Sequence, residues 1–316
     1  MIMALGWCVL ALVFLALGGD SVLKGASGLS RRFHWSPFVT GLLLVAFGTS
    51  IPELAVNARA FFTGSQSLAL GNAVGSNIVN FGLTLGLAAI VAPLLVRWRA
   101  LAPLLICLIV ATIALIALGY DGVLTRIEGA IFVLAFVVVV AVAIVRSRRE
   151  TPEVQEAIAG YLTTGDDLAL NVLRFVIGAV LLYFGAMWLV QHAPIVGTAW
   201  GMSPLLTGLI IVAIATALPE AVAAMAAARR GQGDMVVGHV IGSSLFNLLI
   251  VVGGMAALRD LPIPASFVGF ELPAALAASL LLYPMLRRDL QISRAEGWVL
   301  LLAFIAWVVF ELLLSR

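Results

Sequence analysis

The chain has 316 residues, of which 63% are hydrophobic and only 11% are charged. Soluble domains carry about 25% charged residues, so this composition excludes a water-soluble globular protein of this size. The net charge is only +2, and the arginines are scattered at the ends of apolar segments, which excludes a nucleic-acid-binding surface.

Apolar segments of the length that a helix needs to cross hydrocarbon follow one another along the chain. A β-barrel would alternate apolar and polar residues, whereas a segment such as 130–145 is continuously apolar. The first segment lacks a basic region and a cleavage site, so we interpret it as a membrane helix and not as a removed signal. We therefore expect an all-α, polytopic membrane protein with ten transmembrane helices, at about 2–19, 37–61, 67–92, 101–119, 123–145, 170–191, 204–228, 234–257, 270–286 and 296–314.

The basic residues are distributed unequally over the loops between these helices. Of the 18 lysines and arginines, fourteen fall on one side of the predicted membrane and four on the other. Basic loops stay in the cytoplasm, so both termini are expected outside and the polar loop 146–169 inside. This loop divides the chain into a first five-helix repeat at 1–145, a cytoplasmic linker at 146–169, and a second five-helix repeat at 170–316.

An internal repeat relates the two halves. Displacing the sequence by 167 residues aligns Ser36–Gly86 with Ser203–Gly253 without a gap, and seventeen of the 51 aligned pairs are identical. Five predicted helices separate equivalent positions, and because five is odd the second copy must lie upside down relative to the first. Such inverted repeats are typical of secondary transporters, whose binding site lies near the midplane between the repeats.

Each repeat carries one glutamate in an apolar setting, Glu53 or Glu220, directly after a proline. On a helix, residues four apart share a face, which brings hydroxyl and amide side chains toward each carboxylate. These oxygen ligands are the kind that Ca²⁺ and Na⁺ select. Thr49 and Thr216 share a face with the two glutamates, and the second helix of each repeat carries a further pair, Ser76 with Asn80 and Ser243 with Asn247.

The two glutamates have no basic neighbour in either motif. No lysine or arginine lies between residues 33 and 58 or between residues 175 and 228. An ionised carboxylate at the bilayer centre costs on the order of 2.5–3.5 kcal/mol. The compensating charge must therefore come from the substrate, and two negative charges match one Ca²⁺, two Na⁺ or two H⁺.

At these residues the chain resembles the calcium/cation antiporter superfamily, and most closely its prokaryotic sodium/calcium exchangers. The segments GTSIPE (48–53) and GNAVGSNIVN (71–80) match the first of that family's two repeat motifs in full. The resemblance implies exchange of Ca²⁺ for Na⁺ by alternating access in a prokaryotic plasma (inner) membrane, with Ca²⁺/H⁺ exchange as the alternative. It also implies an ion site of Glu53, Glu220, Thr49, Ser50, Ser76, Asn80, Thr216, Ser243 and Asn247, with the backbone carbonyls of Ala46 and Ala213.

The second repeat departs from the motif. Ala215, Ala217, His239 and Ser244 replace a glycine, a serine and two asparagines. Ala217 removes one candidate Na⁺ ligand. His239 has two interpretations: a histidine packed against a glycine-rich helix, which we favour, or a proton-coupling group, since histidine titrates near neutrality.

Other function classes fit the sequence less well. An intramembrane enzyme would need a catalytic constellation such as a Ser/His couple or an HExxH metal site, and a passive channel would need no countertransported ion. We expect no cofactor other than the transported ions, and no partner beyond these ions and membrane lipid. Outside the repeat motifs, Glu271 is interpreted as a helix-end charge that reaches toward the interface, or as a residue at the mouth that attracts cations.

Overall fold

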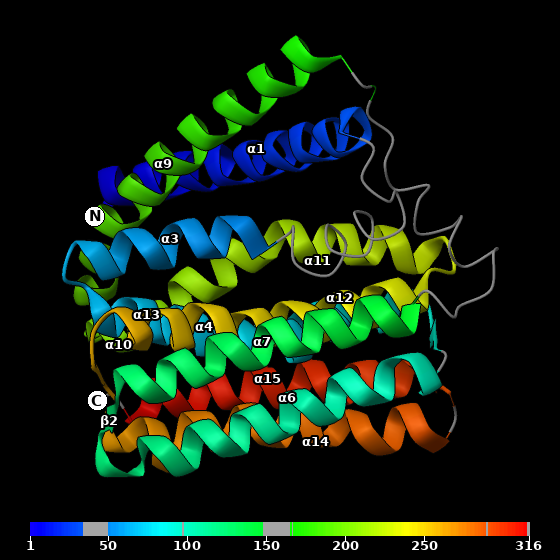
Figure 1. Ribbon diagram of the computed structural model, residues 1–316. Coiled ribbons are helices and arrows are strands. Elements are labelled where there is room, and N and C mark those ends of the chain that lie inside the picture. The colour runs from blue at the N-terminus through cyan, green and yellow to red at the C-terminus, as the bar shows by residue number, and fades with distance from the viewer. Residues whose placement is uncertain (34–49, 97, 148–164, 166, 289, 315–316) are drawn as a thin grey trace.

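A computed structural model describes residues 1–33, 50–96, 98–147, 165, 167–288 and 290–314. It is a bundle of helices, most of which run roughly side by side (Figure 1). Within the described residues, nine helices are long and apolar enough to cross a membrane. The remaining expected span, 37–61, is described only from Ser50 onward, and the expected linker 146–169 lies mostly outside the described residues.

The first half of the chain contains two helical spans that are built from several pieces. The span at 66–91 passes from α-helix through a π-helical turn and back to α-helix. In chain order, the elements of this half are α1 (Ile2–Arg32), α3 (Ile51–Phe62), α4 (Gln66–Val79), the π-helical turn η2 (Asn80–Thr84), α5 (Leu85–Val91), β1 (Leu94–Leu95), α6 (Trp98–Leu118), the 3₁₀ turn η3 (Gly119–Asp121), β2 (Val123–Leu124) and α7 (Arg126–Ser147).

The second half repeats this order. Asp167 caps the first helix by accepting a hydrogen bond from the Leu170 amide at 2.8 Å, and Ser203 caps the next by accepting one from Leu206 at 3.1 Å. The elements are α9 (Leu168–Ala199), α10 (Pro204–Leu206), the π-helical turn η4 (Thr207–Val212), α11 (Ala213–Arg229), α12 (Gly233–Phe246), the π-helical turn η5 (Asn247–Val252), α13 (Gly253–Leu258), β3 (Leu261–Pro262), the π-helical turn η6 (Phe267–Glu271), α14 (Leu272–Arg288), β4 (Gln291–Ile292) and α15 (Arg294–Leu314).

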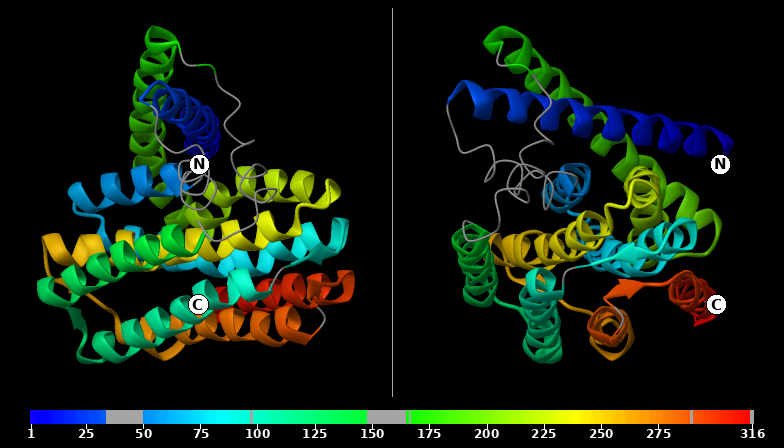
Figure 2. Two further views of the ribbon diagram at one scale, coloured as in Figure 1. Left: turned by 45° about the vertical axis from the view of Figure 1, so that its right-hand side comes forward. Right: turned by 90° about the vertical axis from the view of Figure 1, so that its right-hand side faces the viewer.

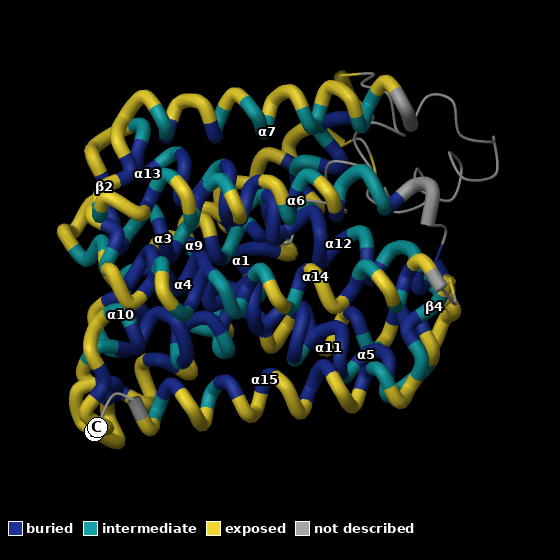
Figure 3. The backbone as a smooth tube through the Cα atoms, turned by 90° about the horizontal axis from the view of Figure 1, so that it is seen from below, coloured by how far each residue is buried: buried dark blue, intermediate teal, exposed yellow. Residues whose placement is uncertain are grey.

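Two short antiparallel strand pairs show the inverted symmetry. β1 pairs with β4, with Leu94 opposite Ile292, and β2 pairs with β3, with Leu124 opposite Leu261. Each pair joins the end of one repeat's motif region to the other repeat, and the two pairs lie at opposite ends of the bundle (Figure 3). The exchange of equivalent partners at opposite ends is what a twofold axis in the membrane plane produces.

Close helix packing follows the same symmetry. A Cβ on Gly129 of α7 would come within 2.6 Å of the Gly253 carbonyl oxygen, and one on Gly297 of α15 would lie 2.9 Å from the Gly86 carbonyl oxygen. Small residues let membrane helices approach this closely. The last helix of each repeat thus packs against a glycine of a motif helix in the other repeat: α7 against α13, and α15 against α5.

The first helix of each half is longer than the sequence predicted. α1 has 31 residues and α9 has 32, whereas the expected spans were 2–19 and 170–191. Residues beyond Gly19 remain helical because α1 and α9 pack along each other, with Gly18 against Gly178 and Gly25 against Asn171. The two helices lie together on one side of the bundle (Figure 2).

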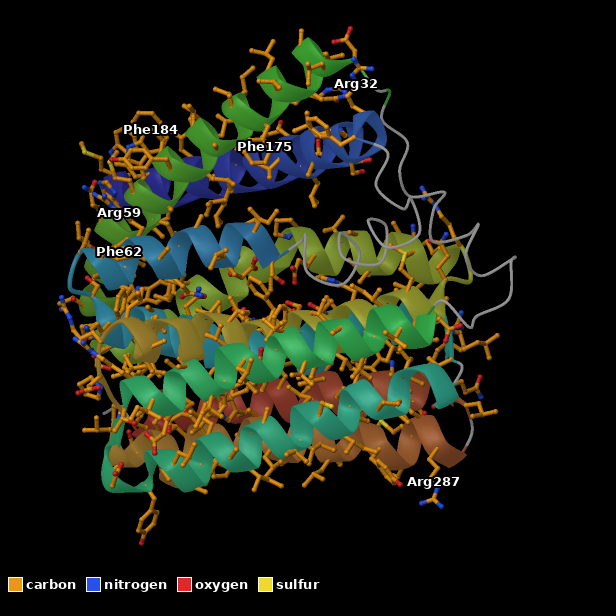
Figure 4. The ribbon with its side chains drawn as sticks, in the orientation of Figure 1. Arg32, Arg59, Phe62, Phe175, Phe184 and Arg287 are labelled. Carbon is orange, nitrogen blue, oxygen red and sulfur yellow. The ribbon has the colours of Figure 1, made fainter. Side chains whose placement is uncertain are left out.

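Burial and charge are arranged as expected for a membrane protein. Buried residues concentrate between the motif helices α4, α11 and α12, while the outer helices expose apolar side chains (Figure 3). Charged side chains lie toward the ends of the helices, with Arg32 and Arg287 at one end and Arg59 at the other (Figure 4). The beginning of α1 and the end of α15 lie at the same end (Figure 1), as an even number of crossings requires.

Candidate ion-binding site

The two glutamates of the repeat motifs lie in adjacent helices in the centre of the bundle. Glu53 is in the first turn of α3 and Glu220 is in the middle of α11, directly after Pro219. Their side chains are 2% and 7% exposed, and the carboxyl groups are close enough to interact electrostatically. The structure therefore brings the acids of both repeats to one place.

Hydroxyl and amide side chains from both repeats surround this place. The Ser50 hydroxyl donates a hydrogen bond of 2.7 Å to the Ser243 Oγ, and the Asn80 amide donates one of 3.3 Å to the same oxygen. Asn80 and Asn247 occupy equivalent places, since each begins a π-helical turn, η2 or η5. A π-helical turn leaves backbone groups outside the regular α-helical ladder, which is why such turns recur at functional sites.

Asn77 connects the two repeats. Its side-chain amide donates a hydrogen bond of 3.2 Å to the Ser244 carbonyl oxygen, and its Oδ1 accepts one of 3.2 Å from Asn247. Asn77 was not among the predicted ligands, although it is part of the GSN segment of the motif. Ser76 was predicted because it shares a helix face with Asn80, a criterion that its neighbour Asn77 does not meet.

The charge of the two carboxyls is not balanced by lysine or arginine. Among the described residues, neither glutamate forms an ion pair with either kind of side chain. Glu53 Oε2 and Glu220 Oε1 are buried without a hydrogen-bond partner in the same set of residues. Leaving two carboxylates unpaired in a dry interior costs several kcal/mol per charge, so the arrangement favours a bound cation or protons.

Thr216 lies beside Glu53. Its Oγ1 donates within α11 to the carbonyl oxygens of Val212, at 3.0 Å, and Ala213, at 3.3 Å, and lies within hydrogen-bonding reach of the Glu53 carboxyl. Ala213 is fully buried at the junction of η4 and α11. The predicted carbonyl ligand thus accepts a hydrogen bond from the same hydroxyl that lies beside the Glu53 carboxyl.

His239 lies beside Glu220. The imidazole Nε2 is 3.6 Å from the Glu220 Oε2, and the side chain is buried. In the first repeat the equivalent residue, Asn72, instead donates a hydrogen bond of 2.9 Å to Asn57. The residue equivalent to Asn57 is Ala224, which offers no amide, and this absence leaves the imidazole facing the carboxylate.

The Ala217 substitution breaks the symmetry of the hydroxyl pair. Ala217 is equivalent to Ser50, and Ser76 is equivalent to Ser243. Ala217 has no hydroxyl to pair with Ser76, so the Ser76 hydroxyl instead donates a hydrogen bond of 3.5 Å to the Asn72 Oδ1. The part of the site at Ala217 consequently has one oxygen atom fewer than the equivalent part at Ser50.

The predicted residues fall into four groups. Glu53, Glu220 and Thr216 lie close together, with the Ala213 carbonyl accepting a hydrogen bond from Thr216, and Ser50, Ser243 and Asn80 form one connected hydrogen-bond network. Ser76 and Asn247 instead bond to asparagines that were not predicted as ligands, Ser76 to Asn72 and Asn247 to Asn77. The last two, Ala46 and Thr49, lie outside the described residues.

The donor set consists almost entirely of oxygen atoms. Carboxylates, hydroxyls and amide carbonyls suit Ca²⁺ and Na⁺, whereas zinc and copper favour His and Cys. Among the described residues, His239 brings an imidazole nitrogen beside Glu220, and a protonated imidazole there would compete with a cation for this carboxylate. The arrangement can therefore exchange one small cation for another, or for a proton.

Comparison with known proteins agrees with this chemistry. Residues 3–145 and 170–313 match the protein family described as "Sodium/calcium exchanger protein". The chain is 34% identical to CaxA of Alkalimonas amylolytica, over 97% of this chain and 98% of that protein. It is 27% identical to the sodium/calcium exchanger MaX1 of Methanosarcina acetivorans, over 95% and 96% of the two chains. A solved structure of the sodium-calcium exchanger NCX_Mj, soaked with Na⁺ and Sr²⁺, superimposes with a TM-score of 0.68 at 28% identity and covers 98% of both chains.

Proposed function

Since the chain belongs to the sodium/calcium exchanger protein family and is a membrane Ca²⁺/cation antiporter, we propose that it exchanges Ca²⁺ for Na⁺ by alternating access through the site between α3 and α11. One observation carries the proposal: Glu53 and Glu220 are buried together without a lysine or arginine partner among the described residues. Their two negative charges match either one Ca²⁺ or two Na⁺. Occupancy by one ion excludes the other, which is the minimum requirement for antiport.

The oxygen ligands complete the proposed site. Ca²⁺ takes six to eight oxygen ligands, and two carboxyls supply four of them at most. We assign the others to Ser50, Thr216, Ser243 and Asn80, all of which are buried, and to the Ala213 carbonyl. Ser76, Asn247, Thr49 and the Ala46 carbonyl remain part of the proposed ligand set on the strength of the repeat motif alone.

The inverted repeats supply the mechanism. Two halves that are related by an axis in the membrane plane can open the same site first to one side and then to the other by exchanging their conformations. The Ser50–Ser243 and Asn77–Ser244 contacts cross between the halves, at the surface that such a movement would shear. We assign the repeats to residues 1–145 and 170–316, joined by a cytoplasmic linker at 146–169.

The orientation follows from the basic residues. Arg32 and Arg287 lie at the end of the bundle opposite to Arg59, as the loop distribution of lysine and arginine requires (Figure 4). We therefore place the end with Arg32 and Arg287 in the cytoplasm of a prokaryotic cell, and both chain termini outside its plasma (inner) membrane.

Ca²⁺/H⁺ exchange is the second candidate, and His239 is the observation that favours it. The imidazole is 3.6 Å from Glu220, and a proton on it would occupy the place of a cation. The missing hydroxyl at Ala217 also removes a Na⁺ ligand.

Radioactive calcium uptake into proteoliposomes distinguishes the two. Ca²⁺ uptake that is driven by an outward Na⁺ gradient at equal pH on both sides supports Na⁺ exchange. Uptake that needs only a pH gradient, and that Na⁺ does not drive, supports H⁺ exchange. Liposomes with a Glu53→Gln protein control for leakage, since this variant should still insert into the membrane.

A further inference from the structure

A second pair of buried acids lies away from the proposed ion site. Glu271 ends the π-helical turn η6 at the start of α14, and Glu311 lies near the end of α15. Their side chains are only 6% and 5% exposed. The sequence interpretation of Glu271 as a helix-end charge reaching toward the interface, or as a residue at the mouth, is therefore wrong, because the protein covers this side chain.

The two acids lie near each other. The residues that precede them, Phe270 and Phe310, have ring centroids 4.9 Å apart, which fixes the start of α14 against the end of α15. The Glu271 and Glu311 carboxyls are close enough to interact electrostatically. At the offset of 167 residues the first repeat has apolar residues in their places, Leu104 and Ile144, so the pair is an addition to the repeated fold and not a part of it.

Three polar atoms around this contact have no hydrogen-bond partner among the described residues. They are the Glu271 Oε2, the Glu311 Oε1 and the indole Nε1 of Trp307, which is 9% exposed. Trp307 precedes Glu311 by one helical turn, so its N–H is on the same face of α15 and lies near the Glu311 carboxyl, although not at hydrogen-bonding distance. A buried N–H donor disfavours a metal ion and favours an acceptor such as a carboxylate.

Among the described residues, neither Glu271 nor Glu311 forms an ion pair. The described side chains of α4, α5, η2, α6 and β4, which pack against α14 and α15, include one titratable group, the Cys107 thiol on α6, and η3, which contacts η6 at Val268, adds Tyr120 and Asp121. On α14 and α15 themselves, the described titratable side chains are Tyr283, Arg287, Arg294 and Glu296. Of these, Tyr283 is twelve residues from Glu271 and Glu296 is fifteen from Glu311, or roughly 18 and 22 Å along the helices at about 1.5 Å per residue.

We propose that Glu271 and Glu311 form a proton-binding site in which the two carboxyl groups share one proton and so join the start of α14 to the end of α15. Two adjacent carboxylates in an apolar site cannot both remain ionised. A shared proton removes one charge, and the Trp307 N–H is placed to donate to the remaining one. Four carboxylate oxygens among phenylalanine rings are too few for Ca²⁺, which takes six to eight oxygen ligands.

The site is independent of the proposed ion site, and infrared spectroscopy can test it without transport. In a protein with Glu53→Gln and Glu220→Gln, which removes the central carboxyls, we expect a band from a protonated carboxyl group at neutral pH that shifts in D₂O and fades as the pH rises. Adding Glu271→Gln and Glu311→Gln together should abolish the band. The matched control is Glu296→Gln on the same helix α15, which should leave it unchanged.

Single substitutions keep the test decisive if the fourfold variant does not fold. Glutamine has nearly the shape of a protonated glutamic acid, so Glu271→Gln or Glu311→Gln alone should fold and should shift or remove the band. A protein without the band, or a band that neither single substitution changes, would contradict the proposal. It would also be overturned if Ca²⁺ or Mn²⁺ shifted carboxylate bands that depend on Glu271 and Glu311, because the pair would then hold a metal ion.

A stability measurement gives a second readout. If the folded protein holds one proton that the unfolded chain releases, the unfolding equilibrium constant should increase by up to about tenfold per pH unit, from the range in which a free glutamate titrates up to the pH at which the folded protein itself releases the proton. Glu311→Gln should reduce this pH dependence, because the amide needs no proton. An unchanged dependence in both Glu311→Gln and Glu271→Gln would exclude the pair as its cause.

Discussion

Restoring the missing hydroxyl at position 217 tests how the site selects its ions. Ala217 is 1% exposed and is equivalent to Ser50, whose hydroxyl donates at 2.7 Å to Ser243. In Ala217→Ser the new hydroxyl should face Ser76 in the same way, and should add one oxygen ligand for Na⁺. We therefore expect Na⁺ to bind more tightly.

The magnitude follows from the contact that is restored. A hydrogen bond or ligand contact to a charged group contributes about 1.5–3 kcal/mol, and fitting an extra oxygen into a fully buried place costs part of it. A net gain of about 1 kcal/mol corresponds to a Na⁺ affinity roughly fivefold higher, because about 1.4 kcal/mol is tenfold. Ser50→Ala should have the opposite effect, since it removes the Ser243 contact from the first repeat.

The assay is the Na⁺ concentration that gives half-maximal Ca²⁺ efflux from proteoliposomes. Ala228→Ser is the matched control, because Ala228 is 2% exposed on the same helix, eleven residues or about 16 Å further along α11. If Ala217→Ser leaves the Na⁺ dependence unchanged, or changes it no more than Ala228→Ser does, the account of the missing ligand is incorrect.

Two further substitutions test other contacts. His239→Asn removes the imidazole 3.6 Å from Glu220; because a protonated imidazole would compete with the cation, Ca²⁺ flux in the variant should be less inhibited by mild acidification, and an unchanged pH profile would exclude His239 from competition. Gly82→Ala would place a Cβ 2.3 Å from the Phe304 Cβ, so it should force α15 away from η2, cost about 1–3 kcal/mol and lower the melting temperature in detergent. Gly254→Ala, where a Cβ meets nothing within 4 Å, should leave the melting temperature unchanged or raise it, and equal losses in both variants would show that packing is not the cause.

The membrane architecture was predictable because it depends on properties that sequence displays directly. Apolar length gives the spans, and the identical pairs at an offset of 167 residues give the inverted repeat. Helix ends were less predictable. Gly18 and Gly25 allow α1 to pack on α9 beyond the apolar segment, and this contact between distant segments extends α1 past the limit that hydropathy indicates.

The candidate site was predictable in its residue types and less so in its connections. Glu53 and Glu220 were found because each repeat has one acid in an apolar setting. The contact between His239 and Glu220 could not be predicted from residue types alone. It depends on position 224 of the neighbouring helix, where alanine stands in place of the asparagine of the first repeat. The partnership of Glu271 and Glu311 was missed for a similar reason, because the acids are forty residues apart and neither belongs to a repeated motif.

The most direct measurement of the central claim is Ca²⁺ flux with each buried acid neutralised in turn. Glu53→Gln and Glu220→Gln keep the shape of the side chain and remove the charge that a cation must balance. We predict that both variants insert into the membrane and fold, and that each loses Na⁺-driven Ca²⁺ flux, whereas Glu296→Gln retains it. Flux near the wild-type rate in either variant would show that the neutralised glutamate does not bind the transported ion.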